Sequence, residues 1–381
     1  MKNKQNTVPD LSEVLSLSKK LVQINTINPP GDEKKCAHFI GEILYEQGYQ
    51  VQYYEFEKNR TSLIARLPGV EPGKPLCFSG HIDTVPLGQK KWKADPFSGE
   101  IIGDKLYGRG SSDMKAAVAA MVAVACHHSR RGPRKSELAL IITAGEEKGC
   151  AGAEYLAGLP NILPQGGVLI IGEPTSNYPF IGHKGCLWLN VEFSGTTAHG
   201  SMPELGDNAI YKASDAIQKL RGFKFQNEHP VLGRPSLNIG TMQGGLNINS
   251  VPDKANFTID IRTVKGQTHQ DIIDAVQKIV GKEAQISTLI NTPSVSADAN
   301  NSWIQQVFQI LEKRWQKQIT PKAAPYFTDA GALVPAMGFP ETLILGPGEL
   351  EQAHATDEFC YVSRIQEAVE IYSEIADRWL Y

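Results

Sequence analysis

Apolar residues in the first 180 positions switch between helical and extended spacing. Leu15, Leu17, Leu21 and Val22 recur at the spacing of one helix face, which predicts a helix over 11–24. Later apolar runs are short, and they either alternate with polar residues or are continuous, as strands are. The pattern predicts a second helix over 33–47, strands over 50–56, 62–67, 137–143 and 168–171, a strand through Leu76, Cys77 and Phe78 up to His81, and an apolar helix over 116–126. This order is typical of an α/β domain.

The pattern changes after Phe180. Alternating apolar and polar residues predict strands near 187–193, 236–241, 255–262 and 284–289, with helices over 207–220 and 268–280. That order, β-α-β-β-α-β, is the ferredoxin-like α+β unit, an antiparallel sheet with helices on one face. We therefore expect an inserted domain at 181–293. The first domain would consist of 1–180 and 294–381, and its last part has predicted helices over 303–317 and 363–380 and a strand over 341–345.

Histidines and carboxylates stand at the ends of predicted strands. His81 and Asp83 end the strand that passes through Phe78, and residues two apart in extended backbone point to the same side. Open α/β sheets bind their ligands at the carboxyl ends of the strands. Other residues of the same kinds follow later strands or precede the apolar helix. The full set is His81, Asp83, Asp113, Glu146, Glu147, Glu173 and His354.

Each of these residues has an ordinary explanation when taken alone. His81 and Asp83 would form a surface pair in a loop. Asp113 would cap the apolar helix, because the helix dipole and free N–H groups favour a carboxylate there. Glu146 and Glu147 would be solvated loop charges. These separate explanations do not predict that three apolar strands all end in acidic or histidine residues, so the sequence favours one shared site.

The combined side chains are typical of a metal site. His81 and His354 offer imidazoles and Asp113, Glu147 and Glu173 offer carboxylates, a nitrogen and oxygen set that suits Zn²⁺, Mn²⁺ or Co²⁺. Two divalent ions and a bridging hydroxide would balance three carboxylates, whereas one ion would leave a negative pocket and spare ligands. We therefore expect two ions about 3.5–4 Å apart. Asp113, at a helix start between the two groups of ligands, is expected to bridge the two ions.

Glu146 is adjacent to a predicted ligand but is not needed as one. Adjacent side chains diverge, so Glu146 can face the substrate while Glu147 faces the metal. A carboxylate there can take a proton from an activated water and pass it to the leaving nitrogen. Asp83 is placed to orient the imidazole of His81 or to lie just behind the metal.

Composition narrows the class of protein. A chain of 381 residues exceeds one typical core, which favours two domains. A net charge of −3 argues against nucleic acid or an anionic membrane as a partner.

The polar segment 1–7 lacks the form of a signal peptide, and 116–126 is about half of the roughly 20 residues that a membrane span needs. The glycines of 108–115 match neither the phosphate-binding loop with its lysine nor a G-x-G-x-x-G motif that opens a helix, so we expect no nucleotide site there. Six cysteines without a Cys-x-x-Cys pair indicate reduced core residues of a cytoplasmic protein.

Five motifs, spread over nearly the whole chain, carry a resemblance to a known family. They are Ser79-Gly80-His81-Ile82-Asp83-Thr84-Val85-Pro86, Gly108-Arg109-Gly110 with Asp113-Met114-Lys115, Glu146-Glu147 with Gly149, Gly172-Glu173-Pro174-Thr175, and Ala353-His354 with Asp357-Glu358. Together they resemble the M20 metallopeptidase family, and most closely its branch of acetylornithine deacetylases and succinyl-diaminopimelate desuccinylases.

The resemblance implies a zinc-peptidase-like catalytic domain, with a mixed sheet covered by helices on both faces. It also implies that His81 and Glu173 bind one metal, that Glu147 and His354 bind the other, and that Asp113 bridges them. Glu146 matches the family's general base, and Asp83 its carboxylate behind the metal. A cis peptide is expected between Asp113 and Met114.

The inserted domain resembles the family's dimerisation or lid domain. His199, in the segment 195–201, matches a histidine that reaches a neighbouring subunit's active site and stabilises the oxyanion. Asn249 and Arg262 match positions that hold the substrate's carboxylate, and a guanidinium can grip a carboxylate through two hydrogen bonds. Otherwise Arg262 would be a salt-bridged arginine on the polar face of the sheet. The expected partners are a small N-acyl amino acid and, through the inserted domain, a second copy of the chain.

These expectations lead to a di-zinc amidohydrolase, with Co²⁺ or Mn²⁺ as other possible metals. It would remove an acetyl or succinyl group from an amino acid such as acetylornithine or succinyl-diaminopimelate, as in amino-acid biosynthesis. An exopeptidase that cleaves small peptides is the alternative, with a different pocket around Arg262 and the loop 326–331. A third hypothesis is a homologue that binds a ligand without catalysis. It is disfavoured because all seven positions of the predicted metal site and general base carry chemically competent residues. The sequence leaves the acyl group and the amino acid open.

Overall fold

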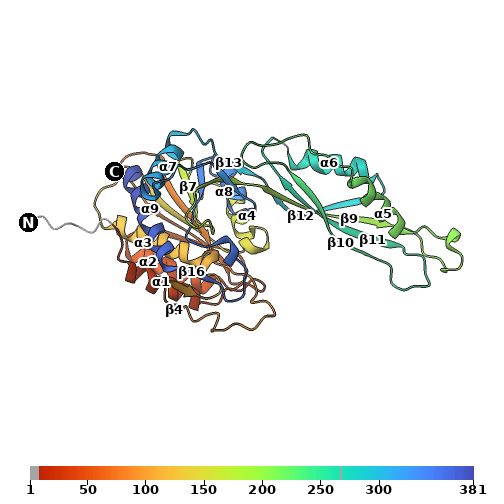
Figure 1. The fold of residues 1–381 in the computed structure, drawn as a ribbon, viewed down its shortest axis with the longest axis horizontal. Coiled ribbons are helices and arrows are strands. Elements are labelled where there is room, and N and C mark those ends of the chain that lie inside the picture. Colours follow the sequence, from red (N-terminus) through yellow and green to blue (C-terminus); the bar gives the residue numbers. More distant parts are fainter. Residues whose placement is uncertain (1–7, 267) are drawn as a thin grey trace, which may run out of the picture. The chain divides into compact units, whose positions relative to one another are not determined.

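The computed structural model describes residues 8–266 and 268–381. The chain forms two compact units (Figure 1). The first runs up to Gly182 and also contains Ala297–Ala324 and Thr328–Tyr381, and the second contains His183–Ser296 and Pro325–Phe327. The limits of the second unit differ by only a few residues from the expected 181–293. The sequence did not predict that 325–327 belongs to it, and the expectation for 1–7 lies outside the described residues.

The first unit is built on one mixed sheet. Its strands follow the order β1-β2-β6-β3-β7-β15-β8-β13, and β14 pairs with β8. Strands β6, β3, β7 and β15 are parallel to their neighbours in that series, whereas β2 is antiparallel to both β1 and β6. The mixed sheet confirms the predicted fold class. The bounds are β1 Gln50–Glu57, β2 Arg60–Leu67, β3 Leu76–His81, β6 Leu138–Thr143, β7 Val168–Ile171, β8 Phe180–His183, β13 Val295–Ser296, β14 Lys322–Ala324 and β15 Glu341–Ile344.

Three central strands bring the predicted site residues to one edge of this sheet. His81, the last residue of β3, lies opposite Thr143, the last residue of β6. On its other side β3 pairs with β7, where Ser79 lies opposite Ile171. Because the three strands are parallel, the loops that carry Glu146 and Glu173 leave from the same edge as His81.

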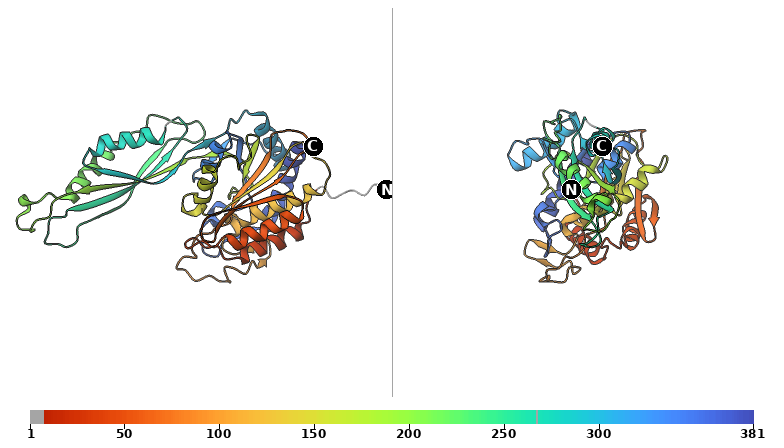
Figure 2. Two further views of the ribbon diagram at one scale, coloured as in Figure 1. Left: turned by 180° about the vertical axis from the view of Figure 1, so that it is seen from behind. Right: turned by 90° about the vertical axis from the view of Figure 1, so that its right-hand side faces the viewer.

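Helices cover both faces of the sheet (Figures 1 and 2). On one face α2, α3 and α9 pack against the strands, α1 packs on α3, and α7 packs on α9 and β15. On the other face α4 contacts β1 and β2, and α8 packs on α4. The bounds are α1 Leu11–Gln23, α2 Lys34–Glu46, α3 Ala116–Ser129, α4 Ala151–Gly158, α7 Ser302–Trp315, α8 Ala330–Ala336 and α9 Val362–Leu380.

Helix α3 is buried on all its faces along most of its length, as its apolar sequence predicts. It begins at Ala116, and Asp113 precedes it in a non-helical conformation with φ −124° and ψ 90°. The explanation of Asp113 as a helix cap is therefore wrong. Its N–H group instead donates to a side chain, that of Glu358, at 3.1 Å. The Asp113–Met114 peptide is cis, as the resemblance implies.

A small three-stranded sheet joins two distant segments next to the site. Its order is β16-β5-β4, with antiparallel pairs. Strand β5 lies shortly before Asp113, and β16 follows soon after His354, so this sheet holds the two segments side by side. The bounds are β4 Ile101–Ile102, β5 Lys105–Tyr107 and β16 Phe359–Tyr361.

The second unit is an antiparallel sheet with two helices on one face (Figure 1). Its strands follow the order β10-β11-β9-β12, and α5 and α6 pack together against it. This arrangement confirms the predicted ferredoxin-like α+β unit. The bounds are β9 Gly185–Ser194, α5 Ala209–Leu220, β10 Ser236–Gly244, β11 Lys254–Thr263, α6 His269–Val280 and β12 Gln285–Thr292.

Two further expectations concern the whole chain. All six cysteines are buried and have free thiols, as predicted. Within residues 8–266 and 268–381, none of the helices combines the length and apolarity that a membrane crossing needs.

A buried histidine at the end of α3 predicts a loss of stability in acid. Within the described residues neither ring nitrogen of His128 has a hydrogen-bond partner, and the nearest carboxylate oxygen, on Asp377, lies 3.9 Å from Nε2. Burial, with repulsion from Arg131, lowers the pKa of His128 from 6.5 to about 3. In the folded chain His128 therefore stays neutral at pH values below 6.5 at which it is protonated in the unfolded chain. The free energy of unfolding should consequently fall as the pH drops from 6.5 toward 3.

The His128→Phe variant, which cannot take up that proton, should lose less stability in acid. The measurement is the unfolding free energy from urea titrations of wild type and variant between about pH 7.5 and pH 5, both treated with chelator. An identical pH dependence in the two proteins would show that His128 makes no such contribution.

Candidate metal centre

Asp83 orients the imidazole of His81. The Nδ1–H group of His81 donates to the main-chain carbonyl of Asp83 at 3.0 Å, and Oδ1 of Asp83 lies 3.5 Å from the same nitrogen. Because a carbonyl oxygen can only accept, Nδ1 carries the proton and Nε2 is directed into the cluster as the possible ligand atom. Nε2 lies 3.1 Å from Oδ1 of Asp113 and 3.9 Å from Oε2 of Glu173.

The two oxygens of Asp113 face different histidines. Oδ1 lies near His81, and Oδ2 lies 3.4 Å from Nε2 of His354. The same nitrogen of His354 lies 3.0 Å from Oε2 of Glu147. One side of Asp113 thus has an imidazole with Glu173, and the other has an imidazole with Glu147.

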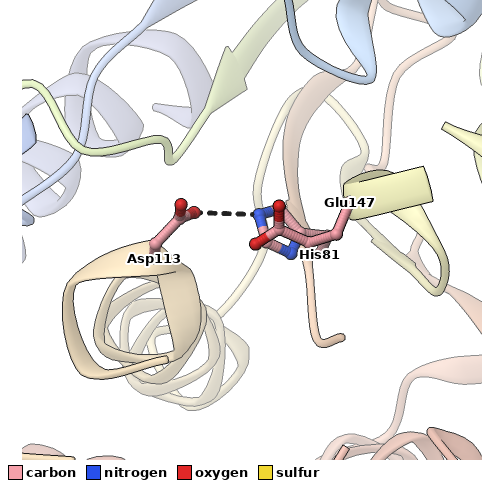
Figure 3. A group of neighbouring side chains, drawn as sticks. All are labelled: His81, Asp113 and Glu147. Carbon is pink, nitrogen blue, oxygen red and sulfur yellow. Dashed lines mark hydrogen bonds and ion pairs between the residues drawn. The ribbon is translucent and has the colours of Figure 1, made fainter. Parts of the chain in front are cut away.

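These side chains converge although they come from separate segments. Figure 3 shows His81, Asp113 and Glu147 directed toward one another. One possible ligand atom from each of the three lies within 4.8 Å of the others. His81, Asp113 and Glu173 are buried, while the side chain of His354 is 56% exposed. The exposed side is where a substrate can approach the cluster.

A tight turn at the end of β6 separates Glu146 from Glu147. Gly145 has φ 79°, a left-handed conformation that residues with a Cβ atom rarely adopt, which favours glycine at this position. The next residues form a short 3₁₀ turn, in which successive side chains point about 120° apart. Glu147 faces His354, whereas Oε1 of Glu146 accepts a weak hydrogen bond from the Cys150 thiol at 3.8 Å.

Asp83 also holds the turn that carries these two glutamates. Its Oδ1 accepts a hydrogen bond from the N–H group of Glu146 at 3.0 Å, and its Oδ2 accepts one from that of Glu147 at 3.2 Å. The side-chain amide of Asn28 donates to Oδ2 at 2.8 Å. The carboxylate of Asp83 is fully buried. It therefore links the loop of His81 to the turn of Glu146 and Glu147.

The electrostatics of the cluster favour a bound cation. Burial raises the pKa of Glu146 and of Glu173 well above their usual range, and burial with repulsion from Asp113 raises that of Glu147. Hydrogen bonds to Asp113 and Glu147 raise the pKa of His354 to about 10. These directions mean that protons and divalent cations compete for the same atoms.

The second oxygen of Glu147 also favours a bound cation. Oε1 of Glu147 is buried, and among the described residues it has no hydrogen-bond partner. An unpaired buried carboxylate oxygen is costly unless a cation neutralises it. Imidazole and carboxylate donors without a thiolate suit Zn²⁺, Mn²⁺ or Co²⁺. The residues present therefore fit divalent metal ions.

His199 and Asn249 lie together in the second unit, on two exposed loops. His199 forms an isolated β-bridge with Ser250, and the N–H group of Gly200 donates to the main-chain carbonyl of Asn249 at 2.7 Å. The N–H group of Ser201 donates to Nδ1 of His199 at 3.2 Å. Nδ1 is therefore the acceptor nitrogen, and in neutral His199 the proton lies on Nε2.

Arg262 lies elsewhere in the same unit and already has a partner. On β11 its Nε lies 2.9 Å from Oδ1 of Asp260, and its guanidinium carbon lies 6.0 Å from the ring centre of Phe327. The sequence left a salt-bridged arginine open as the alternative to a substrate contact, and this ion pair is of that kind. A substrate carboxylate would have to compete with Asp260 or share the guanidinium with it.

Two buried carboxylates near the cluster were not predicted to act. Glu358 accepts hydrogen bonds from the segment that carries Asp113. Asp329, at the start of α8, accepts one from the hydroxyl of Thr143 at 2.5 Å, beside the turn of Glu146. The sequence placed both in motifs or loops of interest, but neither follows a buried strand. Only the fold shows that Glu358 contacts main-chain N–H groups of the Asp113 segment and that Asp329 contacts the hydroxyl of Thr143.

Sequence comparison identifies relatives of the whole chain. Residues 77–378 match the model of "Peptidase family M20/M25/M40". An acetylornithine deacetylase of Proteus mirabilis (strain HI4320) is 30% identical, with 87% of this chain and 85% of the relative covered. A probable succinyl-diaminopimelate desuccinylase of Staphylococcus epidermidis (strain RP62A) is 28% identical, with 98% and 99% covered.

Structure comparison gives the same fold. An M20 family metallo-carboxypeptidase from Sulfolobus solfataricus superimposes with a TM-score of 0.80 at 19% identity, with 96% of this chain and 99% of the other covered. At that identity the match establishes the fold alone. The family match covers most of the chain, and the cluster of imidazoles and carboxylates fits divalent ions. The chain therefore belongs to peptidase family M20/M25/M40 and is a metal-dependent hydrolase of that family.

Proposed function

We propose that the chain is a two-metal amidohydrolase that removes an acetyl or succinyl group from the nitrogen of an amino acid. The observation that carries the two-metal part is the arrangement around Asp113, whose two oxygens face different histidine and glutamate pairs. The deacylase part is supported by relatives named acetylornithine deacetylase and succinyl-diaminopimelate desuccinylase at 28–30% identity over most of the chain.

The proposed ligand sets follow from these contacts. His81 and Glu173 would hold one ion, Glu147 and His354 the other, and Asp113 would bridge them. Zn²⁺ is the proposed metal, with Co²⁺ and Mn²⁺ as alternatives that the same donors accept. Bound there, two divalent ions polarise the scissile carbonyl and lower the pKa of the attacking water.

Glu146 is the proposed general base. Its main-chain N–H group is held by Asp83, and its carboxylate is buried and diverges from Glu147 on the 3₁₀ turn. The Glu146 carboxylate would take a proton from the attacking water and deliver it to the nitrogen of the departing amino acid. Burial raises the pKa of Glu146, which makes it a stronger base than an exposed glutamate.

Groups of the second unit are proposed to bind the substrate. The Nε2–H group of neutral His199 is a donor for the oxygen that becomes negative when the amide is attacked. Asn249, on the neighbouring loop, would hold the substrate beside it. The guanidinium of Arg262 would bind the carboxylate of the amino acid through two hydrogen bonds. Acetate or succinate and the free amino acid would be the products.

The distance between these groups supports a homodimer with shared active sites. Arg262 lies near one end of β11, and the loops of His199 and Asn249 lie beyond Lys254 at the other end. At about 3.3 Å per residue the two ends are about 26 Å apart, which exceeds the length of a small N-acyl amino acid. One copy of the second unit cannot bring both to one substrate. We propose that a second copy of the chain supplies His199 and Asn249.

The His199→Ala variant tests this arrangement. We expect a fall in kcat of about 10²-fold or more with unchanged metal content, because only the oxyanion donor is lost. Mixed after reversible dissociation with an inactive Glu146→Ala variant, it should regain about a quarter of wild-type activity, since half of the random dimers contain one intact shared site. If each chain uses its own His199, the mixture stays inactive.

A hydrolysis panel tests the proposed reaction. The purified chain is loaded with Zn²⁺, Co²⁺ or Mn²⁺ and assayed with N-acetyl amino acids, N-succinyl amino acids, dipeptides and tripeptides. The proposal predicts release of acetate or succinate, with a higher kcat/KM on one N-acyl amino acid than on any peptide. Hydrolysis of peptides alone would replace it with an exopeptidase, and no hydrolysis by metal-loaded protein would leave a binding protein.

A further inference from the structure

The segment that carries Asp113 directs several main-chain N–H groups at one point. Asp113 and Met114 are not helical, and Gly110 has a left-handed conformation with φ 81°. The N–H groups of Gly110, Ser112 and Asp113 therefore do not all enter the hydrogen-bond ladder of α3. Converging main-chain N–H groups of this kind form a pocket for an anion.

The side chain of Glu358 fills that pocket. Oε2 accepts the N–H group of Gly110 at 2.9 Å, and Oε1 accepts those of Ser112 at 2.8 Å and Asp113 at 3.1 Å. Glu358 is fully buried, so water cannot replace it as an acceptor. Its carboxylate is the hydrogen-bond partner of three N–H groups over four consecutive residues.

Arg109 balances the charge of Glu358. The Nη1 group of Arg109 donates to Oε2 of Glu358 at 2.7 Å, and both side chains are 1% exposed. Breaking a buried ion pair by removing one charge leaves the other uncompensated, which is strongly destabilising. The pair thus fixes the carboxylate in one position, and the carboxylate in turn fixes the conformation of the segment 110–113.

Ser112 makes a second connection between the same two segments. Its hydroxyl donates to the main-chain carbonyl of Phe359 at 2.8 Å and accepts the N–H group of Glu349 at 3.1 Å. These two residues lie on either side of His354 in the chain. The segment 349–359, which carries His354, is therefore joined to the segment of Asp113 both by Ser112 and by Glu358.

We propose that Glu358 is a positioning residue of the metal centre, which sets the carboxylate of Asp113 relative to the imidazole of His354. It contacts no reacting group itself. This inference rests on the proposed function, because it takes Asp113 as the bridging ligand and His354 as a ligand on one side. The side-chain contact between them, 3.4 Å from Oδ2 to Nε2, is the geometry that Glu358 holds.

The Glu358→Gln variant tests the proposal. An amide of the same shape has one acceptor oxygen, so its NH₂ group must face either the N–H groups of Ser112 and Asp113 or that of Gly110 together with Arg109. We expect Zn²⁺ and Co²⁺ affinity, measured by competition with a chelator, to fall about 10–100-fold, as for other residues that orient ligands. The visible absorption of the Co²⁺-loaded variant should also change, because it reports the ligand geometry.

Two matched variants keep the result interpretable. Glu137→Gln breaks another two-contact pair, in which Glu137 accepts from Arg66 at 2.9 Å beside the opposite ends of the strands. It should lower the melting temperature without changing metal affinity or the Co²⁺ spectrum. Glu358→Asp keeps the charge facing Arg109 but withdraws the acceptor by one methylene, so it should fold if Glu358→Gln does not, and should weaken metal binding.

The outcomes separate this inference from the proposed function. If Glu358→Gln and Glu358→Asp lower only the melting temperature and bind Co²⁺ like wild type, Glu358 is merely structural and the inference is overturned. If wild type binds no divalent ion, or His81→Ala binds as many ions as wild type, the metal centre itself is assigned wrongly. Weakened binding in both Glu358 variants with a normal Glu137→Gln supports the inference.

Discussion

Replacing Glu146 with glutamine should lower kcat roughly 10²–10⁴-fold, while the variant still binds two metal ions per chain. Glutamine has nearly the same shape but cannot accept the proton of the attacking water. Its main chain would remain held, because the contact with Asp83 uses the N–H group of residue 146 and not the side chain. The measurements are kcat on the best substrate of the panel and metal content by elemental analysis.

The exposed Glu154, on α4 after the same turn, provides the control. Glu154→Gln should retain wild-type kcat and metal content. Near-normal turnover in Glu146→Gln would remove Glu146 from the mechanism. Loss of metal from Glu146→Gln would instead make residue 146 a ligand.

Replacing Asp113 with alanine should abolish the binding of both ions, and with it the hydrolysis. Its two oxygens face His81 and His354 separately, so one substitution removes a donor from each proposed site. Replacing His354 should affect the site shared with Glu147 more than the site shared with Glu173. Isothermal titration of chelator-treated protein with Zn²⁺ gives the number of ions bound and their affinities.

The variants Asp113→Ala, His354→Ala and wild type should therefore bind none, one and two ions with high affinity. Two tight ions in Asp113→Ala would show that Asp113 is not a bridge. Circular dichroism of each variant guards against misfolding, because Asp113 is buried and its segment is held by Glu358.

The strand-end pattern was enough to predict where most of the cluster lies. Apolar runs that end in His81, Glu146 and Glu173 turn out to be three adjacent parallel strands, β3, β6 and β7. Their shared edge follows from general rules of α/β sheets. The β-α-β-β-α-β order of the second unit could also be predicted from the sequence, because alternating strands and amphipathic helices have clear periodicities.

The conformation of the Asp113 segment was not readable from local pattern alone. A carboxylate just before an apolar helix looks like a cap, but α3 begins at Ala116 and the N–H group of Asp113 binds a residue 245 positions away. The sequence also did not predict that Asp83 both orients His81 and holds the turn of Glu146 and Glu147. Its side chain contacts main-chain N–H groups of Glu146 and Glu147, and a main-chain partner leaves no signature in the sequence.

Anomalous diffraction from a crystal of the zinc-loaded protein tests the central claim most directly. The account predicts two zinc peaks per chain, about 3.5–4 Å apart, with Asp113 between them. His81 and Glu173 should contact one peak, and Glu147 and His354 the other. A single peak, or a pair of peaks that does not share Asp113, would contradict the account.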